Sequence, residues 1–486
     1  MAILSTLLSI PVCGALLLIV IPQDYSALIR SVANLITALA LLTAIMVWQQ
    51  FDPGNAAVQF SEFYPLNPKL GSAYALGVDG LSLPMLLLAT LLSCVALLAS
   101  FSIQESLKGY HICVLLLEFG MLGVFMAQDW ALFYIFWEVT LIPLFFLIDR
   151  WGGKRRHAAS LNFVLYTMGG SVFMLLSLLA ISQYDLEQQG SLMVAMGQAA
   201  QSMPVLEQVL VLLGFLIGFG VKMPVFPLHG WLPLAHVEAP SPISILLSGI
   251  LLKMGAYGLL RTIAMLPVAV KLLQPLLASL ALFGMVYGGL LAWRQSDLKA
   301  MVAYSSLSHM GVVLLGIATL NQAGLMGAVL QMTAHGLLAA VMFLWVGLLY
   351  QRSHSREIQD HPGILPTLPR FAWLVSLALL AAMGLPGFLG FIAEFQILLG
   401  GFQQWHWLML VFSIGVLISA AYALRTLNCL WQQRHGATVL ALADLNALEF
   451  SVGAVLVGGL LGLGLMPDGL MHLSTATVSR LLLAFE

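Results

Sequence analysis

Long apolar runs follow one another along almost the whole chain, and they constrain its fold more than any other feature. About twenty apolar residues cross the roughly 30 Å hydrocarbon core of a bilayer as one helix. Only 8% of the 486 residues are charged, against about a quarter in soluble proteins. Such a chain cannot cover an ordinary water-facing surface, so we predict an all-α, polytopic membrane protein.

The apolar runs, separated by polar or Gly/Pro breaks, predict about fourteen transmembrane helices. The run at 2–22 is too long for a signal peptide and has no basic start, so we interpret it as the first span. Only residues 49–80, 184–204 and 350–370 are long enough to be sizeable loops. The predicted spans begin near Ala2, Leu28, Leu81, Tyr110, Leu132, Ser160, Val205, Ile243, Val270, Ala300, Leu325, Phe371, Trp407 and Phe450.

Lysine and arginine are distributed unequally between the two sets of loops. Of the 19 such residues, thirteen lie in loops after odd-numbered spans and four in loops after even-numbered spans or in the tail. Because cytoplasmic loops carry the excess of positive charge, we predict that both termini face away from the cytoplasm. The two remaining residues, Lys222 and Lys253, lie within predicted spans.

Six ionisable residues of both signs lie inside predicted spans. A charge at the bilayer centre costs several kcal/mol, so such residues face a cavity and find a partner. Any one of them alone could be a structural Lys–Glu pair or a hydrogen-bonded core histidine, but six together favour proton translocation. Glu118 also lies within a span, and for it the structural and functional interpretations both stay open. The six are Glu138, Lys222, Lys253, His309, His335 and Glu394.

A buried lysine can act as a proton switch. When its carboxylate partner moves or becomes neutral, the lysine changes between holding and releasing its proton. Histidines titrate nearest to neutral pH, which suits them to the links between such switches.

Helix-breaking residues interrupt two spans beside ionisable side chains. The first break begins at Lys222 and contains Pro224 and Pro227, and the second is Gly384–Gly390, close to Glu394. Broken helices at membrane depth occur where the freed backbone lines protein or water. In our count these are spans seven and twelve. Because the offset of five is odd, it predicts two inverted five-helix repeats, the arrangement typical of a transport site.

The repeats divide the chain into four parts. We predict accessory spans 1–3 at residues 1–103, a first inverted repeat (spans 4–8) at 110–263, a second (spans 9–13) at 270–431, and a C-terminal span with its tail at 449–486.

Several sequence signatures are missing. The cysteines at 13, 94, 113 and 429 stand alone, which disfavours zinc, iron–sulfur and disulfide frameworks. No Walker, GxGxxG or HExxH motif is present, and nothing in the charge suggests a nucleic-acid partner. The chemistry that drives this chain is therefore expected to lie in another protein.

Five segments carry a family likeness: GVDGLSLPMLLL (77–88), FYIFWEVTLIPLFFLIDRWGG (133–153), KMPVFPLHGWLPLAHVEAPSPISILLSGILLKMGAYGLLR (222–261), AYSSLSHMG (303–311) and GLPGFLGFIAEF (384–395). They resemble the antiporter-like subunits of respiratory complex I, and within that group subunit M, or chain 4. The resemblance implies a proton-translocating subunit of a quinone oxidoreductase that binds no cofactor itself. Iron–sulfur clusters and quinone would belong to partner subunits. The implied partners are other membrane-arm subunits, the peripheral redox arm and lipids.

The same resemblance implies a role for each buried ionisable residue. Glu138 and Lys222 match the Glu–Lys pair of a first half-channel. The central hydrophilic axis corresponds to Lys253, His309 and His335. Glu394 matches the terminal residue of the second half-channel.

A finer likeness is to the cyanobacterial type of this chain, through FWEVTLIPLFFLIDRWGG and the following RRHAASLNFVLYTMGGSVFMLL. It implies a thylakoid or bacterial inner membrane, ferredoxin as electron donor and plastoquinone as acceptor, and some variants of this type serve carbon dioxide uptake. Two other interpretations stay open: a cation/proton antiporter chain with no redox partner, and a structural subunit that moves nothing. Glu394 disfavours the antiporter, whose related chains tend to carry lysine there, and the buried charges disfavour the structural subunit.

Overall fold

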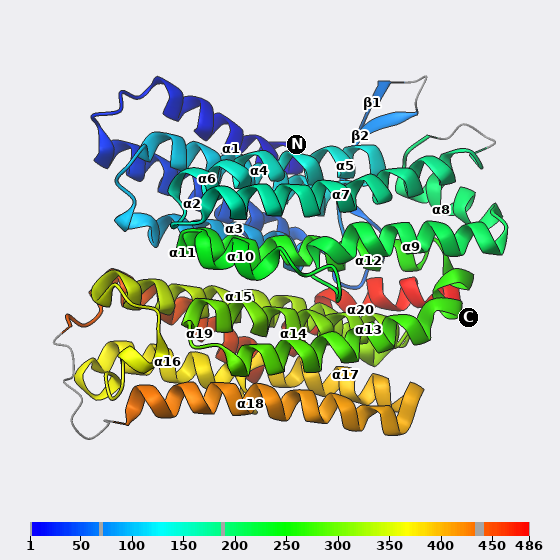
Figure 1. Ribbon diagram of the computed structural model, residues 1–486. Helices are drawn as coiled ribbons and strands as arrows, with labels where there is room; N and C mark the ends of the chain where they lie inside the picture. The colour runs from blue at the N-terminus through cyan, green and yellow to red at the C-terminus, as the bar shows by residue number, and fades with distance from the viewer. Residues whose placement is uncertain (1, 68–70, 186–189, 433–441, 486) are drawn as a thin grey trace.

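The chain folds into a layered bundle of helices (Figure 1) in a computed structural model that describes residues 2–67, 71–185, 190–432 and 442–485. The predicted all-α class is confirmed, with one small addition, a β-hairpin. The helices of the first half are α1 (Ile3–Val20), α2 (Ser26–Gln50), α3 (Ser82–Leu98), α4 (Leu107–Met126), α5 (Trp130–Val139), α6 (Leu141–Trp151), α7 (Arg156–Ser182), α8 (Met193–Ser202), α9 (Val205–Lys222), α10 (Leu232–Glu238), α11 (Ser241–Leu246) and α12 (Leu252–Ile263).

The second half has longer helices. They are α13 (Pro267–Arg294), α14 (Leu298–Ala318), α15 (Gln322–Ser353), α16 (Pro369–Ala382), α17 (Leu389–Trp405), α18 (Met409–Trp431), α19 (Ala447–Leu465) and α20 (Asp468–Leu482).

Thirteen helical segments among the described residues are long and apolar enough to cross a membrane. One of them, Leu389–Trp431, has 43 residues, and a straight helix of that length would measure about 65 Å, twice a bilayer core. It contains α17 and α18, which a 3₁₀ turn at His406–Leu408 separates. Dividing it there gives the fourteen predicted crossings, with α16 and α17 together forming a single broken span.

Both predicted helix breaks are present. The helix α9 ends at Lys222 and α10 begins at Leu232, while α16 ends at Ala382 and α17 begins at Leu389. Figure 1 shows α4–α12 as one layer and α13–α18 as a second layer beside it. The breaks occupy matching places in the two halves, as the repeat prediction requires, and the inverted symmetry itself stays a prediction.

A third irregularity, which the sequence analysis missed, lies in span eight. Residues Leu247–Leu251 form a π-helical turn (η2) between α11 and α12. Such turns shift the helical register by one residue and leave backbone carbonyls without their usual partners, often at functional sites.

The predicted loop 49–80 contains the hairpin of β1 (Gln59–Asn67) and β2 (Ser72–Val78). The strands are antiparallel, with Glu62 opposite Leu76 and Tyr64 opposite Tyr74. The side chains of β1 are largely exposed, whereas Ala75–Val78 on β2 are buried, so the hairpin closes one end of the bundle. The loop 184–204 likewise contains a helix, α8, that the apolar-run criterion overlooked because it is short.

The core lies around α15, which is buried from Gly324 to Leu349. Glycines allow its neighbours to approach closely: a Cβ on Gly327 would lie 2.9 Å from the carbonyl oxygen of Ala393 on α17. Span eight is also fully buried in its most apolar window. The polar side chains on these helices therefore have no access to lipid and must find partners within the protein.

Candidate functional site

Four of the predicted residues form a continuous row that runs from the last helix of the first half into the middle of the second half. Lys253 Nζ on α12 lies 2.7 Å from His335 Nδ1 on α15. The rings of His335 and of His309, on α14, have centroids 5.3 Å apart. His309 Nδ1 in turn lies 3.8 Å from a carboxylate oxygen of Glu394 on α17. Four helices thus bring together residues that are up to 141 positions apart in the sequence.

The π-helical turn positions the lysine at the start of this row. Lys253 Nζ donates a hydrogen bond of 2.6 Å to the backbone carbonyl of Ser248, which lies in the turn. The Ser248 hydroxyl lies 2.9 Å from that of Ser306 and connects the turn to α14. The local irregularity therefore supplies an acceptor that a regular α-helix would use internally.

The two histidines are buried, with Nε2 of each lacking a protein partner among the described residues. Gln331 Nε2 lies 3.3 Å from His309 Nδ1. Between them and Glu394 is a cavity of about 10 Å³, enough for about one water molecule. A single water there could bridge the distance of 3.8 Å between His309 and the carboxylate.

Glu394 lies directly against the second helix break. A Cβ on Gly384 would be 2.7 Å from Glu394 Oε2, and Gly384 has a left-handed φ of +68°. The break therefore brings backbone alongside the buried carboxylate, as its sequence position predicted.

Lys222 lies at the first break, where α9 ends. Its Nζ donates to the Thr140 hydroxyl at 3.0 Å and lies 3.9 Å from the ring centroid of Trp137. Thr140 is the residue at which α5 ends and α6 begins, so the junction of these two helices forms part of the site.

Glu138 does not form a direct ion pair with Lys222 in the described structure. No contact within 4.0 Å joins the two charged groups, although both side chains lie in the described structure. Glu138 is half-buried and borders an outward-facing apolar groove of about 580 Å³, with Tyr134 and Ile142 among its lining residues. A shift of side chains or a bridging group is needed before the carboxylate reaches the lysine.

Sequence reasoning missed several polar residues of this region. His236 on α10 is fully buried, stacks on Phe343 with centroids 4.8 Å apart, and has neither ring nitrogen partnered within the described residues. Lys299 on α14 is 4% exposed and donates to the carbonyl of Ala239. His236 follows Pro233, and Lys299 follows Asp297, which begins a helix. A polar residue shortly after a helix-breaking or helix-capping residue is the sequence pattern that could have identified both.

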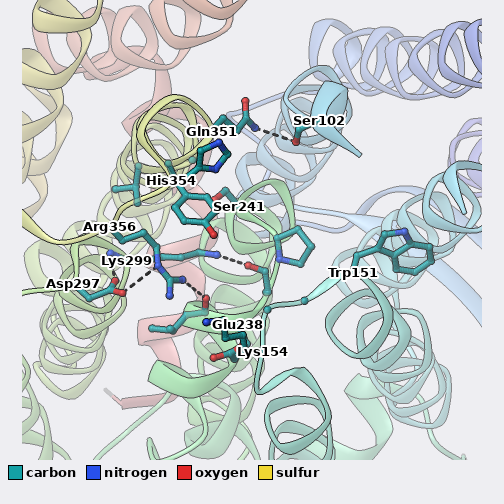
Figure 2. A pocket seen from close by; sticks show the side chains of 18 of the residues that line it. Ser102, Trp151, Lys154, Glu238, Ser241, Asp297, Lys299, Gln351, His354 and Arg356 are labelled. Atoms are coloured by element: carbon teal, nitrogen blue, oxygen red, sulfur yellow. Dashed lines mark hydrogen bonds and ion pairs between the residues drawn. The ribbon is translucent and has the colours of Figure 1, made fainter. Parts of the chain in front are cut away.

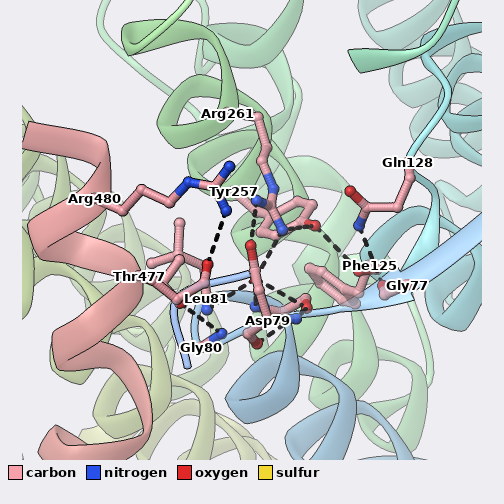
Figure 3. A network of polar contacts seen from close by, with 12 residues as sticks. Gly77, Asp79, Gly80, Leu81, Phe125, Gln128, Tyr257, Arg261, Thr477 and Arg480 are labelled. Carbon is pink, nitrogen blue, oxygen red and sulfur yellow. Dashed lines mark hydrogen bonds and ion pairs between the residues drawn. The ribbon is translucent and has the colours of Figure 1, made fainter. Parts of the chain in front are cut away.

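The opposite end of span eight is held by an ion pair (Figure 3). Arg261 binds both carboxylate oxygens of Asp79, at 2.5 and 2.8 Å, and also the Tyr257 hydroxyl at 2.8 Å. The next residue, Gly80, makes two hydrogen bonds with α20: its carbonyl accepts one from the Ser474 hydroxyl, and its N–H donates one to the Thr477 hydroxyl. The GVDG segment thus joins α3, α12 and the C-terminal helix.

Two other sequence observations have structural counterparts. Glu118 is fully buried, and neither carboxylate oxygen has a hydrogen-bond partner in the described part of the chain, so its role stays open. In the same part of the chain, no three His, Cys, Asp or Glu side chains are grouped to hold a metal ion.

Comparisons with known proteins agree on one group. Residues 127–419 match the family model described as NADH:quinone oxidoreductase/Mrp antiporter, transmembrane. The chain is 39% identical to an NAD(P)H-quinone oxidoreductase chain 4 of Picosynechococcus, over 96% of this chain and 89% of that protein. It is 36% identical to NADH-quinone oxidoreductase subunit M of Rhodobacter capsulatus, over 99% and 96%.

Solved structures give the same picture. A chain of respiratory complex I from Thermus thermophilus superposes with a TM-score of 0.88 at 32% identity, covering 99% of this chain and all of that one. A chain of the Mrp complex from Dietzia has a TM-score of 0.84 at 21% identity, covering 99% of this chain and 55% of that one. The Dietzia match shows a shared fold only.

Proposed function

The chain belongs to the NADH:quinone oxidoreductase/Mrp antiporter transmembrane family, and we propose that it is a proton-translocating membrane-arm subunit of a complex I-type quinone oxidoreductase. Its partners are the other membrane-arm subunits and the peripheral redox subunits of that complex. The chain itself supplies the proton path, whereas partner subunits carry the iron–sulfur clusters and the quinone site.

The observation that carries this proposal is the row Lys253–His335–His309–Glu394. Lys253 lies 2.7 Å from His335, the two histidine rings have centroids 5.3 Å apart, and His309 lies 3.8 Å from Glu394. These contacts connect three helices of the predicted second repeat to the end of the first. Burial of four neighbouring ionisable groups is unfavourable in a purely structural core, because each group adds a desolvation penalty. A proton path needs them.

Each residue of the row has a role in moving protons. Lys253 Nζ holds a proton against the Ser248 carbonyl and passes it to His335 Nδ1. His309 receives it from His335 and delivers it toward Glu394, through water in the intervening cavity. Glu394, beside the Gly384 break, is the far end of the row.

In the first half, Glu138 and Lys222 form the switch that drives the row. Lys222 contacts Thr140 and the Trp137 ring, while Glu138 borders the apolar groove without a direct contact to the lysine. A signal from a neighbouring subunit that moves the Glu138 carboxylate toward Lys222 would stabilise the ammonium, and the reverse motion would favour release of the proton.

The orientation of the chain in the membrane follows from its basic loops. Hydrogen bonds join several of these loops to one another at one end of the bundle. Arg30 donates to the carbonyls of Phe101 and Ile103, and Arg356 to that of Val237. This end is proposed to face the cytoplasm, with both termini on the other side of a thylakoid or bacterial inner membrane.

The assignment to the cyanobacterial type of chain 4 rests on the similar proteins. Several are cyanobacterial chain 4 proteins at 36–39% identity, yet chain 4 of Chondrus crispus is 37% identical. The cyanobacterial type, ferredoxin as donor, plastoquinone as acceptor and a carbon dioxide uptake variant are therefore proposals. A multisubunit cation/proton antiporter chain is the second candidate, favoured only by the shared fold.

Replacement of Lys253 tests the proposal. In the assembled complex reconstituted into vesicles, Lys253→Ala is expected to lower the number of protons pumped per quinone reduced. Lys271→Ala is the control, because Lys271 is exposed and its ammonium lies against the Phe485 carbonyl and ring. An unchanged pumping ratio in a correctly assembled Lys253→Ala complex would remove the lysine from the path.

A further inference from the structure

The helix α3 runs beside span eight and is fastened near both of its ends. Just before its start, Asp79 pairs with Arg261 near the end of α12 (Figure 3). Past its other end, the Ser102 hydroxyl accepts a hydrogen bond of 3.0 Å from Gln351 Nε2, near the end of α15 (Figure 2). Ser102 and Gln351 line a polar cavity of about 940 Å³ at the end of the bundle that carries the basic loops. The helices to which α3 is fastened, α12 and α15, are those that carry the first two residues of the row.

Between these two anchors, the π-helical turn crosses α15 at a pair of glycines. A Cβ on Gly336 of α15 would lie 3.0 Å from the carbonyl oxygen of Gly249 in the turn, so the backbones approach closely because neither residue has a side chain. Gly249 directly follows Ser248, whose carbonyl accepts from the ammonium of Lys253. Gly336 directly follows His335, whose Nδ1 lies against the same ammonium. The position of this crossing therefore sets the distance between the lysine and the histidine.

Two leucines of α3, one helical turn apart, lie against this crossing. A Cβ on Gly249 would overlap Cδ1 of Leu92, and a Cβ on Gly336 would overlap Cδ2 of Leu88. Both leucines are buried, and residues four apart lie on the same face of a helix. Their methyl groups therefore fill the side of the crossing that faces α3. We call Leu88 and Leu92 the leucine clamp.

The spacing of the contacts along the chain fits two helices that lie side by side. Leu92 lies 13 positions after Asp79, and Gly249 lies 12 positions before Arg261. At 1.5 Å per residue, each stretch measures about 18–20 Å. An α3 that is fixed by its ion pair therefore brings Leu92 level with Gly249, and a displacement of α3 along its axis would move the clamp off the crossing.

We propose that α3 sets the Lys253–His335 contact, with Leu88 and Leu92 as positioning residues for proton transfer between the two halves. The proposal rests on the proposed pumping function and adds the element that controls its central step. With the clamp in place, an N–H bond of Lys253 breaks as one to His335 Nδ1 forms, which moves one proton and no electrons. When α3 shifts, the crossing loosens and the two nitrogens separate. The transfer then slows, because it needs hydrogen-bond distance.

Shortening the clamp tests the proposal in the assembled complex reconstituted into vesicles. Leu92→Ala should cause at least half of the loss in protons pumped per quinone reduced that Lys253→Ala causes. Leu92→Val also removes Cδ1, with a smaller loss of volume, and decides the test if Leu92→Ala does not assemble. Leu86→Ala is the matched control and should pump at the parent ratio. Leu86 lies on α3 and is 0% exposed, like Leu92, but the atoms nearest to the two glycines come from other residues.

An exchange of size between Gly249 and Leu92 tests the contact itself. In Gly249→Ala the new methyl group overlaps the leucine, whereas the Gly336 carbonyl oxygen lies at an ordinary contact distance of 3.5 Å. Gly249→Ala should therefore lose pumping, and Gly249→Ala/Leu92→Ala should regain at least half of that loss. Gly249→Ala/Leu86→Ala should regain none of it. Equal pumping by the two double variants would overturn the clamp.

A test in the Lys253→Ala background separates positioning from a general weakening of the fold. If the clamp acts through the lysine, Leu92→Ala adds no further loss of pumping once the lysine is gone. A further loss as large as that in the parent would show that Leu92 acts elsewhere.

The outcomes separate the clamp from the function. If Lys253→Ala pumps normally, the proposed function fails. If Lys253→Ala is impaired while the assembled Leu92→Ala or Leu92→Val complex pumps at the parent ratio, the function stands and α3 does not set the contact. Native gels establish that each variant is assembled.

Discussion

Lys253 Nζ and His335 Nδ1 lie 2.7 Å apart, and this contact joins α12, at the end of the first half, to α15 in the core of the second half. The lysine is held on its other side by the Ser248 carbonyl at 2.6 Å, which the π-helical turn makes available. Within the row of ionisable residues, the link between the two halves is therefore a hydrogen bond whose geometry depends on a local irregularity in the backbone.

We expect the effects of Lys253→Ala and His335→Ala to be strongly non-additive. Either change breaks the same link, so the double variant should pump about as poorly as the worse single one, with a coupling of about 0.5–3 kcal/mol. The rates of proton pumping, measured for the four members of the cycle, give this value. Losses that simply add would show that the two residues act in separate places.

The Thr140 hydroxyl is expected to matter for Lys222. Thr140→Val keeps the shape but removes the acceptor at 3.0 Å, and loss of one hydrogen bond of about 0.5–1.5 kcal/mol should slow pumping about 2- to 12-fold. Thr140→Ser retains the hydroxyl and is the control. If valine and serine behave alike, Lys222 does not depend on this bond.

The positions of the ionisable residues along their helices were predictable from the sequence, but the contacts between distant helices were not. The placement of Glu394 beside the Gly384 break follows from residues close together in the chain, and it was anticipated. The Lys253–His335 contact joins positions 82 apart, so it depends on how α12 and α15 pack. Likewise, Glu138 lies on a predicted span, but its place beside the outer groove, without a direct contact to Lys222, depends on how the helices pack.

The ion pair of Asp79 and Arg261 should stabilise the assembled subunit. Asp79 is 3% exposed, and breaking a buried pair by removing one partner costs about 3–5 kcal/mol. Asp79→Asn should therefore lower the temperature at which the subunit dissociates from the complex. Asp24→Asn is a matched control, since Asp24 is exposed.

The same pair predicts the direction of a pH effect. Burial alone would raise the pKa of Asp79, but the Arg261 guanidinium and backbone N–H groups lower it overall, below its usual 3.8. A lowered pKa means that the stabilisation is fully present above about pH 4 and is lost as the pH falls through the folded-state value. The advantage of the parent over Asp79→Asn should stay constant from pH 8 to pH 5 and shrink only in stronger acid. A decline beginning near neutral pH would contradict this assignment.

Alanine substitutions at the glycines of the second break distinguish the effect of backbone strain from that of crowding the Glu394 side chain. Both Gly384 and Gly387 have left-handed φ angles, +68° and +103°, so alanine is strained at either position, by about 1–2 kcal/mol. Only at Gly384 does the added Cβ meet Glu394, at 2.7 Å from Oε2, whereas at Gly387 it meets nothing within 4 Å. If proton movement depends on where the Glu394 carboxylate lies, the Gly384→Ala complex should pump far fewer protons per quinone reduced than the Gly387→Ala complex. Neither change replaces an ionisable residue. Equal losses in the two variants would mean that strain in the break, and not the position of the carboxylate, limits pumping.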